Sequence, residues 1–305
     1  RLAGQAGEER PHLGRVEAAL GDSQHLHQPL GVLVGIVEAS QLLGGLAVLG
    51  IDGAHLLEEL ECAAPARLHS GLEVHAADPH QEVETLVAGG LAQVTALDVR
   101  GPSAHVTARG AVALAGQNTS DLTYVIDVAD LESFQSLTPH AIDGSAHVEG
   151  RITGPAGALE TTGTMSATTV TLGPVKAMAF KSTFDLAVPD NDVKRTTGQV
   201  DVNGAYIEVS GTRIDEVIGT LHYDGTRLEA DATVAERART LRFKGALVPH
   251  PDHHEIHISS LSFLAADMEW QMPAGQEAVP QYAADRLVVR NLQLARGDAR
   301  IRIDG

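Results

Sequence analysis

The densest group of residues that could bind a metal ion lies between positions 250 and 257, where four histidines, one aspartate and one glutamate follow one another closely. Imidazole and carboxylate groups at such spacing can bind zinc. If a turn precedes a strand here, Glu255 and His257 share its solvent-facing side, while His253 and His254 lie in the turn. A metal site needs three or four converging ligands, which a hairpin turn does not guarantee. We therefore interpret the segment as a solvated turn and assign no metal or other cofactor.

The other groups of reactive side chains are weaker candidates. The Asp-Asn-Asp run at 190–192 resembles the start of a calcium loop but lacks the glycine and the distant glutamate that complete one. Glu229 and Asp231 alternate along one segment, which places both in water rather than in a catalytic pocket. Cys62 has no activating neighbour, and the short motifs of serine hydrolases, zinc proteases and nucleotide-binding enzymes are missing. We predict no catalytic residues and no enzyme.

Composition excludes further classes of function. The chain has 305 residues and a formal net charge of −18. Such an acidic chain is a poor candidate for nucleic-acid binding, because phosphate contacts require clustered lysine and arginine. One cysteine excludes a disulfide framework within the chain. The hydrophobic fraction of 43% is nevertheless sufficient for a core.

A change in composition divides the chain near residue 93. No aromatic residue precedes Tyr124, and Thr85 is the single threonine before position 94. Capping signals and a sustained helical period are poor in this part. We hypothesise that 1–93 is an irregular N-terminal region, mistranslated or disordered. The alternative is a membrane-spanning helix over the apolar run 30–51, which Glu38 and several glycines weaken.

Segment 94–305 alternates between apolar and polar residues with a period of two. In one example, apolar or small residues at Ala146, Val148, Gly150 and Ile152 alternate with polar ones. Strict alternation predicts strands with one buried and one solvated face, hence an antiparallel sheet. Pairs such as Asp143-Gly144, Asn203-Gly204 and Asp224-Gly225 favour tight hairpins or bulges. The single helix expected is 130–137, with Asp130 as its N-cap.

These patterns predict an all-β fold: an extended, curled antiparallel β-meander that forms an open hydrophobic groove. The apolar face carries mostly small aliphatic residues and few rings, which suits a sheet curled around something as slender as an acyl chain. We expect the following residues to line the concave face: Val106, Leu114, Val148, Ile152, Met165, Leu186, Val202, Val209, Leu228, Val234, Phe243, Ile256 and Ile258. The opposite face should carry Glu149, Arg151, Glu208, Glu229 and Asp231.

Segment 94–305 resembles the TamB/AsmA-like family of bacterial envelope proteins. The resemblance rests on residues 130–158 (DLESFQSLTPHAIDGSAHVEGRITGPAGA), where a short helix and a proline precede a strand that ends in Gly-Pro. It continues in the strand patterns of 270–273 and 287–294 and in the Gly297-Asp298 turn before Ile301 and Ile303. The chain departs from the family pattern at its N-terminus, where a clean membrane anchor is missing, and Gly305 stops in mid-pattern. We expect an interior fragment of a longer protein.

The resemblance implies a periplasmic, lipid-conducting β-groove, in a full-length protein anchored in the bacterial inner membrane. Its implied role is phospholipid transport, or support of outer-membrane protein assembly, between the two membranes. The implied partners are phospholipid acyl chains and an outer-membrane β-barrel assembly protein, with no nucleic acid. The alternative is a β-rich adhesion or protein-binding scaffold, which would present its loops to another molecule.

Overall fold

The computed structural model describes residues 73–74, 81–115, 117–137, 141–190, 192, 195–209, 211–250, 252–283 and 286–305. Cys62, Asn191 and the apolar run 30–51 lie outside these residues. Within them, no helix has both the length and the apolar character needed to cross a membrane.

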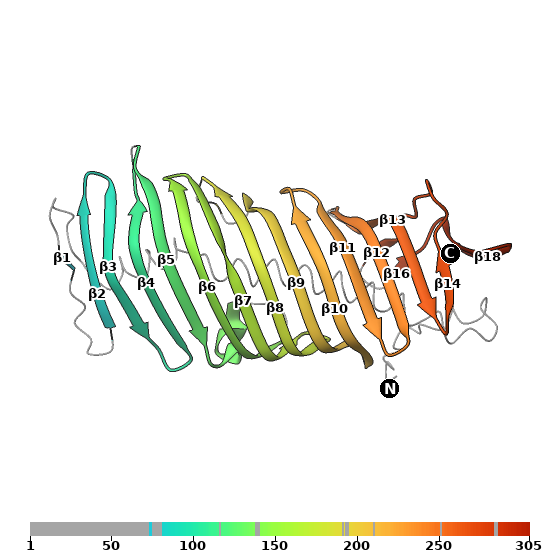
Figure 1. Ribbon diagram of the computed structural model, residues 1–305. Coiled ribbons are helices and arrows are strands. Elements are labelled where there is room, and N and C mark those ends of the chain that lie inside the picture. Colours follow the sequence, from blue (N-terminus) through green and yellow to red (C-terminus); the bar gives the residue numbers. More distant parts are fainter. Residues whose placement is uncertain are drawn as a thin grey trace, which may run out of the picture.

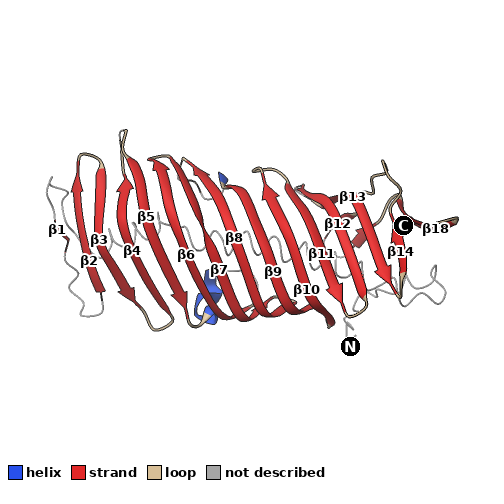
Figure 2. Ribbon diagram, viewed as in Figure 1, coloured by secondary structure: helices blue, strands red, loops and turns tan. Residues whose placement is uncertain are grey.

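The described chain is built almost entirely of strands, as Figure 2 shows. They are β1 (Glu73–Val74), β2 (Gln81–Ala88), β3 (Leu91–Arg100), β4 (Ala104–Ala113), β5 (Thr119–Val128), β6 (Ile142–Pro155), β7 (Ala158–Leu172), β8 (Val175–Pro189), β9 (Thr197–Val209), β10 (Thr212–Tyr223), β11 (Leu228–Glu236), β12 (Arg239–Pro249), β13 (His254–Ala265), β14 (Met268–Gln271), β15 (Gln281–Ala283), β16 (Arg286–Val288), β17 (Leu292–Arg296) and β18 (Ala299–Ile303). One 3-10 helix, η1 (Leu131–Leu137), connects β5 to β6.

From β2 to β13, each strand pairs antiparallel with the next in sequence, which gives the long row of neighbouring strands in Figure 1. Beyond β13 the pattern changes, because β13 pairs with both β14 and β15, and β14 pairs with β17. The sheet stays open and does not close into a barrel. The predicted all-β antiparallel meander is therefore confirmed.

Strand pairing begins before the boundary predicted at residue 93. β2 and the first residues of β3 belong to the sheet, joined by a hairpin whose two turn residues are Gly89 and Gly90. Both glycines have positive φ, 60° and 77°, as a two-residue type I′ turn requires. Because β1 also pairs with β2, placing all of 1–93 outside the sheet was wrong for residues 73–74 and 81–93. The turn signal of Gly89-Gly90 lies inside the region that the sequence analysis separated by its composition.

Of the three Asx-Gly pairs named above, two lie inside strands. Asp143-Gly144 forms a bulge in β6, where the register with β7 shifts and Gly144 has a φ of 114°. Asn203-Gly204 is neither turn nor bulge: it lies within β9, where Gly204 pairs with Phe180 and gives room to that ring and to Ile207. Only Asp224-Gly225 forms a hairpin turn, between β10 and β11.

The predicted helix at 130–137 is present as the 3-10 helix η1. Asp130 caps it as expected: its carboxylate accepts hydrogen bonds from the Glu132 amide at 3.0 Å and the Ser133 hydroxyl at 2.9 Å. Leu131 is buried against Ile142 and Leu172, so η1 packs onto one face of the sheet.

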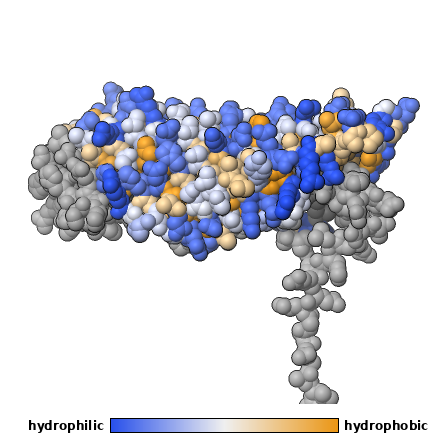
Figure 3. Space-filling view, turned by 60° about the horizontal axis from the view of Figure 1, so that its bottom comes forward, coloured by the Kyte–Doolittle hydropathy of each residue, from blue (hydrophilic) through white to orange (hydrophobic). Residues whose placement is uncertain are grey.

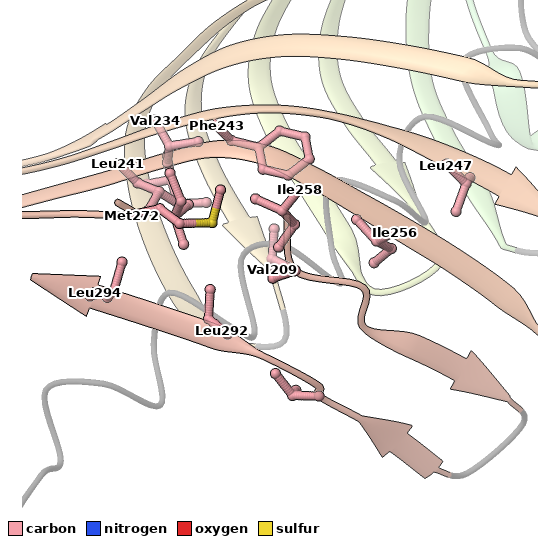
Figure 4. Close-up of a cluster of buried hydrophobic side chains, with 14 residues drawn as sticks. Val209, Val234, Leu241, Phe243, Leu247, Ile256, Ile258, Met272, Leu292 and Leu294 are labelled. Carbon is pink, nitrogen blue, oxygen red and sulfur yellow. The ribbon is translucent and has the colours of Figure 1, made fainter. Parts of the chain in front are cut away.

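The largest hydrophobic core lies at the C-terminal end of the sheet. There the chain returns over the sheet face after β14, and Figure 4 shows Leu292 and Leu294 of β17 opposite Leu241, Val234 and Ile258. This segment turns one end of an otherwise single-layered sheet into a two-layered, closed structure.

Candidate functional site

Backbone register assigns every strand residue to one of two faces. Val148 lies directly opposite Ile126 and Met165, whereas its neighbour Glu149 lies opposite Val125 and Thr164. Residues directly opposite each other share a face, and successive residues alternate. We call the face that carries Val148 the apolar face and the one that carries Glu149 the polar face.

Four cross-strand rows of residues make up the apolar face. The first runs Ala104, Val128, Ala146, Ala167, Phe180, Gly204, Val217, Val234, Leu241, Phe263, Trp270. The second runs Val99, Val106, Ile126, Val148, Met165, Ser182, Val202, Gly219, Ala232, Phe243, Leu261. The third runs Leu97, Ala108, Tyr124, Gly150, Gly163, Phe184, Val200, Leu221, Ala230, Gly245, Ile258. The fourth runs Val94, Gly110, Leu122, Ile152, Thr161, Leu186, Gly198, Tyr223, Leu228, Leu247, Ile256.

No charged residue interrupts any of these rows. Each row therefore continues from strand to strand along the direction of the inter-strand hydrogen bonds. Viewed from the side drawn in Figure 3, the surface is mixed, with hydrophobic patches set between hydrophilic ones. The continuity of the apolar face is therefore seen in the pairing of residues across the strands and not in this view of the surface.

Aromatic rings fill the places that glycines leave on this face. Tyr124 and Phe184 occupy the same row on either side of Gly150 and Gly163. A Cβ added at Gly150 would lie 2.6 Å from the Tyr124 hydroxyl, and one at Gly163 would lie 2.6 Å from Cζ of Phe184. Each ring therefore extends over a neighbouring glycine, an arrangement that restores the contacts a glycine lacks.

The polar exceptions in the rows are Ser182 and Thr161. Both are buried, and Thr161 is only 1% exposed. The Thr161 hydroxyl forms a hydrogen bond of 3.0 Å with the Tyr124 hydroxyl. Burial raises the pKa of Tyr124, and the hydrogen bond to Thr161 opposes that shift.

A change of face within β9 explains how Val202 and Val209 share the apolar side although an odd number of positions separates them. Tyr206 has a φ of 52°, outside the strand region, and its side chain is 69% exposed. On either side of it, Gly204 and Val209 are both buried. Thr169 of β7 has a similar φ of 53°. The alternation therefore resets near these residues.

The predicted groove residues fall into three groups. Val106, Val148, Met165, Val202, Ile152 and Leu186 lie in the second and fourth rows, before the closed end, and Leu228 of the fourth row packs against the closed core. Val209, Val234, Phe243, Ile256 and Ile258 belong to the closed C-terminal core. Leu114 follows the end of β4 and is 44% exposed.

Two of these placements correct the predicted open groove. The five residues of the closed core are covered by β17 and its flanking segment, so they do not line an open surface. Leu114 lies in the turn after β4, where its amide donates to the carbonyl of Gly90, and it belongs to none of the four rows. Local alternation could not reveal either fact, because both depend on contacts with distant segments.

The polar face carries the five residues predicted for it. Glu149 and Asp231 share one cross-strand row, and Arg151 and Glu229 share the next. Glu208 lies opposite Lys176 and Arg213. These charged side chains make this face of the sheet polar and solvated.

The predicted carboxylate pair has cations as its nearest charged partners. Lys244 lies 3.4 Å from Asp231, and Arg227 lies 3.5 Å from Glu229. Arg151 contacts Asp121 at 2.7 Å, and this hydrogen bond holds the pKa of Asp121 below its ordinary value. A pair arranged in this way forms ordinary surface salt bridges. Asp190, from the predicted calcium-like run, likewise forms an ion pair with Arg195.

Sequence reasoning missed one depression in the surface of the sheet. Its volume is about 530 Å³ and its lining includes Arg100, His105, Asp127, His147 and Ser166. Asp127, His147 and Ser166 are successive residues of one cross-strand row, and His147 Nδ1 lies 2.6 Å from Asp127. Among the described residues, however, no hydrogen bond joins Ser166 to His147. The row thus lacks the nucleophile–base contact of a hydrolase triad.

The histidine-rich segment at 250–257 is more ordered than a solvated turn. It brings His250, His253 and Glu255 together at the end of the β12–β13 hairpin, with ligand atoms within 4.8 Å of one another. As predicted, Glu255 and His257 share a side of β13, and their side chains are 3.2 Å apart.

Comparisons with family models, with curated proteins and with solved structures find no match to this chain. The fold and the four rows alone therefore define the class: an open antiparallel β-sheet protein with one apolar and one polar face.

Proposed function

We propose that the apolar face carries the acyl chains of phospholipids, as a segment of a bacterial envelope protein that moves lipid, or supports outer-membrane protein assembly, between the inner and outer membranes. The observation that carries the proposal is the continuity of the four apolar rows from β4 to β13 without a charged residue.

The length of this face suits a lipid tail that shifts from strand to strand. Neighbouring strands are about 4.8 Å apart, so the part of the rows before the C-terminal core, from β4 to β9, extends over roughly 24 Å. Burial of apolar surface contributes about 25 cal/mol per Å², or about 0.8 kcal/mol per methylene. Because the next strand offers similar apolar surface, a chain can move along the rows without chemistry and without leaving an apolar environment.

The part open to lipid would precede the C-terminal core. Val106, Ile126, Val148 and Met165 follow one another in the second row, Val202 comes after the buried Ser182, and all five apolar residues are only half-buried. The core around Phe243 is instead occupied by the chain itself. A tail moving along the face would therefore meet the returning C-terminal segment as the end of its path.

The periplasmic location, inner-membrane anchoring and an outer-membrane β-barrel assembly partner rest on the resemblance carried by residues 130–158. The structure supports this part of the proposal only through an open β-sheet with an apolar side.

The test uses photocrosslinking residues placed in the chain as it exists in bacterial cells. Groups at Val148 and Ile152, on the apolar face, should capture phospholipid, whereas groups at the adjacent polar-face positions His147 and Arg151 should not. A charge in the path, as in Val148→Glu, should lower labelling at Ile152 because burying a charge opposes the passage of an acyl chain. Glu149→Gln is the matched control on the polar face.

Equal labelling on both faces, or none on either, would contradict the lipid proposal. In that case the adhesion or protein-binding scaffold becomes the better interpretation, since a scaffold has no reason to bring lipid to one face alone.

A further inference from the structure

Two histidine rings are held side by side at one end of the sheet. The backbone amide of His250 donates to the carbonyl of His253 at 2.8 Å, which closes the turn between β12 and β13. The two rings stack with centroids 4.6 Å apart and planes at 12°. The hairpin therefore fixes two imidazoles as neighbours on one short turn.

Glu255, on β13, reaches both imidazoles. Its carboxylate oxygens lie 3.3 Å from His253 Nε2 and 3.6 Å from His250 Nε2. A tetrahedral zinc ion with bonds of about 2.1 Å separates its ligand atoms by about 3.4 Å. Each of these two N···O separations is close to such an edge, and they involve different oxygens of the carboxylate. One ligand atom from each of the three residues lies within 4.8 Å of those of the other two.

One of these ring nitrogens is buried without a hydrogen bond. His250 Nε2 has no hydrogen-bond partner among the described residues, although 38% of the side chain as a whole is exposed. A buried polar nitrogen without a partner is unfavourable. A metal ion at the centre of the cluster would satisfy it, because neutral imidazole offers a lone pair on this atom.

Further polar groups surround the three residues in the way that supports metal ligands. Asp252 lies 2.9 Å from His253 Nδ1, which favours the tautomer with a free Nε2 lone pair. Gln281 donates to Glu255 at 2.8 Å from the neighbouring strand β15. His257, 3.2 Å from Glu255, is oriented by Glu277 at 2.8 Å and could supply a fourth ligand.

We propose that His250, His253 and Glu255 bind a divalent transition-metal ion, with His257 or water as the fourth ligand. Two imidazoles and one carboxylate suit zinc, whereas calcium and magnesium prefer all-oxygen sites. The ion would bind the β12–β13 hairpin alone, while Glu277 and Gln281, which orient its ligands, belong to the segment after β14. Its role would be to hold the closed C-terminal end together, independently of any lipid on the apolar face.

The experiment uses the purified full chain after treatment with EDTA. Cobalt(II) titration should produce the intense visible absorption of a tetrahedral site, and zinc should then displace it at one equivalent. Loss of a partner that merely orients a metal ligand lowers affinity by about 10- to 100-fold. Loss of a ligand in His253→Gln or Glu255→Gln should exceed that effect and abolish the absorption.

Because the chain contains 15 histidines, a matched control is required. His147→Gln removes a histidine of the depression near Asp127 and should leave both the cobalt spectrum and zinc affinity unchanged. Zinc should also raise the Tm of the wild type but not of His253→Gln. His250→Gln, in the turn, provides a second variant if His253→Gln fails to fold. The proposal is overturned if wild type and His250→Gln bind cobalt with the same spectrum and affinity, or if zinc binds only at millimolar concentration.

Discussion

The hydroxyl groups of Tyr124 and Thr161 meet at 3.0 Å on the apolar face, although they belong to β5 and β7 and another strand lies between them. The Tyr124 ring spans that strand where it has glycine, at Gly150. The bond pairs two hydroxyls that are both buried. A single glycine thus allows a polar contact to be made without breaking the apolar character of the face.

Tyr124→Phe should destabilise the protein, because it leaves the Thr161 hydroxyl buried without its partner. The expected loss is about 1–3 kcal/mol in the free energy of unfolding. Urea denaturation measures it, with Thr161→Val and the double variant completing a double-mutant cycle. Because removal of both partners can be nearly neutral, the double variant should be more stable than the sum of the two single effects. Strict additivity would show that the bond contributes nothing.

Gly163→Ala should destabilise the sheet through overpacking. The new methyl group would lie 2.6 Å from Cζ of Phe184 and would also meet the backbone of Glu149. The expected cost is about 1–3 kcal/mol, measured by urea denaturation. Gly101→Ala is the control, since its nearest contact is 3.6 Å away and its φ is not positive. Equal effects at both positions would show that Phe184 does not depend on this glycine.

The two faces of the sheet could be predicted from sequence because alternation is a local property. In β6, Val148 and Glu149 follow the period of two, and antiparallel pairing carries the same pattern to their neighbours. The cap at Asp130 was equally local, since its hydrogen bonds reach residues only two or three positions away. The alternation in β6 and the cap at Asp130 are therefore confirmed.

Other features depend on contacts between residues far apart in the chain. Gly204 looked like part of a turn, yet pairing with Phe180 of the neighbouring strand places it inside β9. The closure over Phe243 by Leu292 depends on a chain reversal after β14 that alternation cannot reveal. The convergence around Glu255 likewise depends on Gln281, 26 positions further along the chain.

Leu292→Ala and Leu294→Ala should each weaken the closed C-terminal end. Both side chains are almost completely buried, at 3% and 4% exposure, within the cluster that includes Leu241 and Ile258. Truncation of a buried leucine costs about 2–5 kcal/mol. Hydrogen exchange should show the loss of protection concentrated in β12, β13 and β17. Leu264→Ala, at an exposed position of β13, is the control and should cost far less. Loss of protection spread evenly to β4 would contradict a separate C-terminal core.

The Asp224 turn should make the stability of the protein depend on pH in the acid range. The backbone amide of Thr226, its hydroxyl and the amide of Arg227 all donate to the Asp224 carboxylate at 2.8–2.9 Å and hold its pKa below the ordinary 3.8. A lowered folded-state pKa contributes stability that is present above 3.8 and is lost as the pH falls through the folded-state value. The stability difference between wild type and Asp224→Ala should therefore be larger at pH 7 than at pH 3 in urea titrations. A difference that is independent of pH would contradict this assignment.

The change of face in β9 should depend on the left-handed backbone of Tyr206. A φ of 52° is unfavourable for most residues with a Cβ, costs roughly 1–2 kcal/mol, and is readily adopted by glycine. Since the side chain is 69% exposed, Tyr206→Gly loses little packing and should be neutral or stabilising, whereas Tyr206→Val should destabilise because β-branched residues resist this conformation. Tyr206→Phe keeps the backbone preference and serves as the control. Urea denaturation ranks the variants, and equal stability of the glycine and valine variants would show that the face change does not require a left-handed residue here.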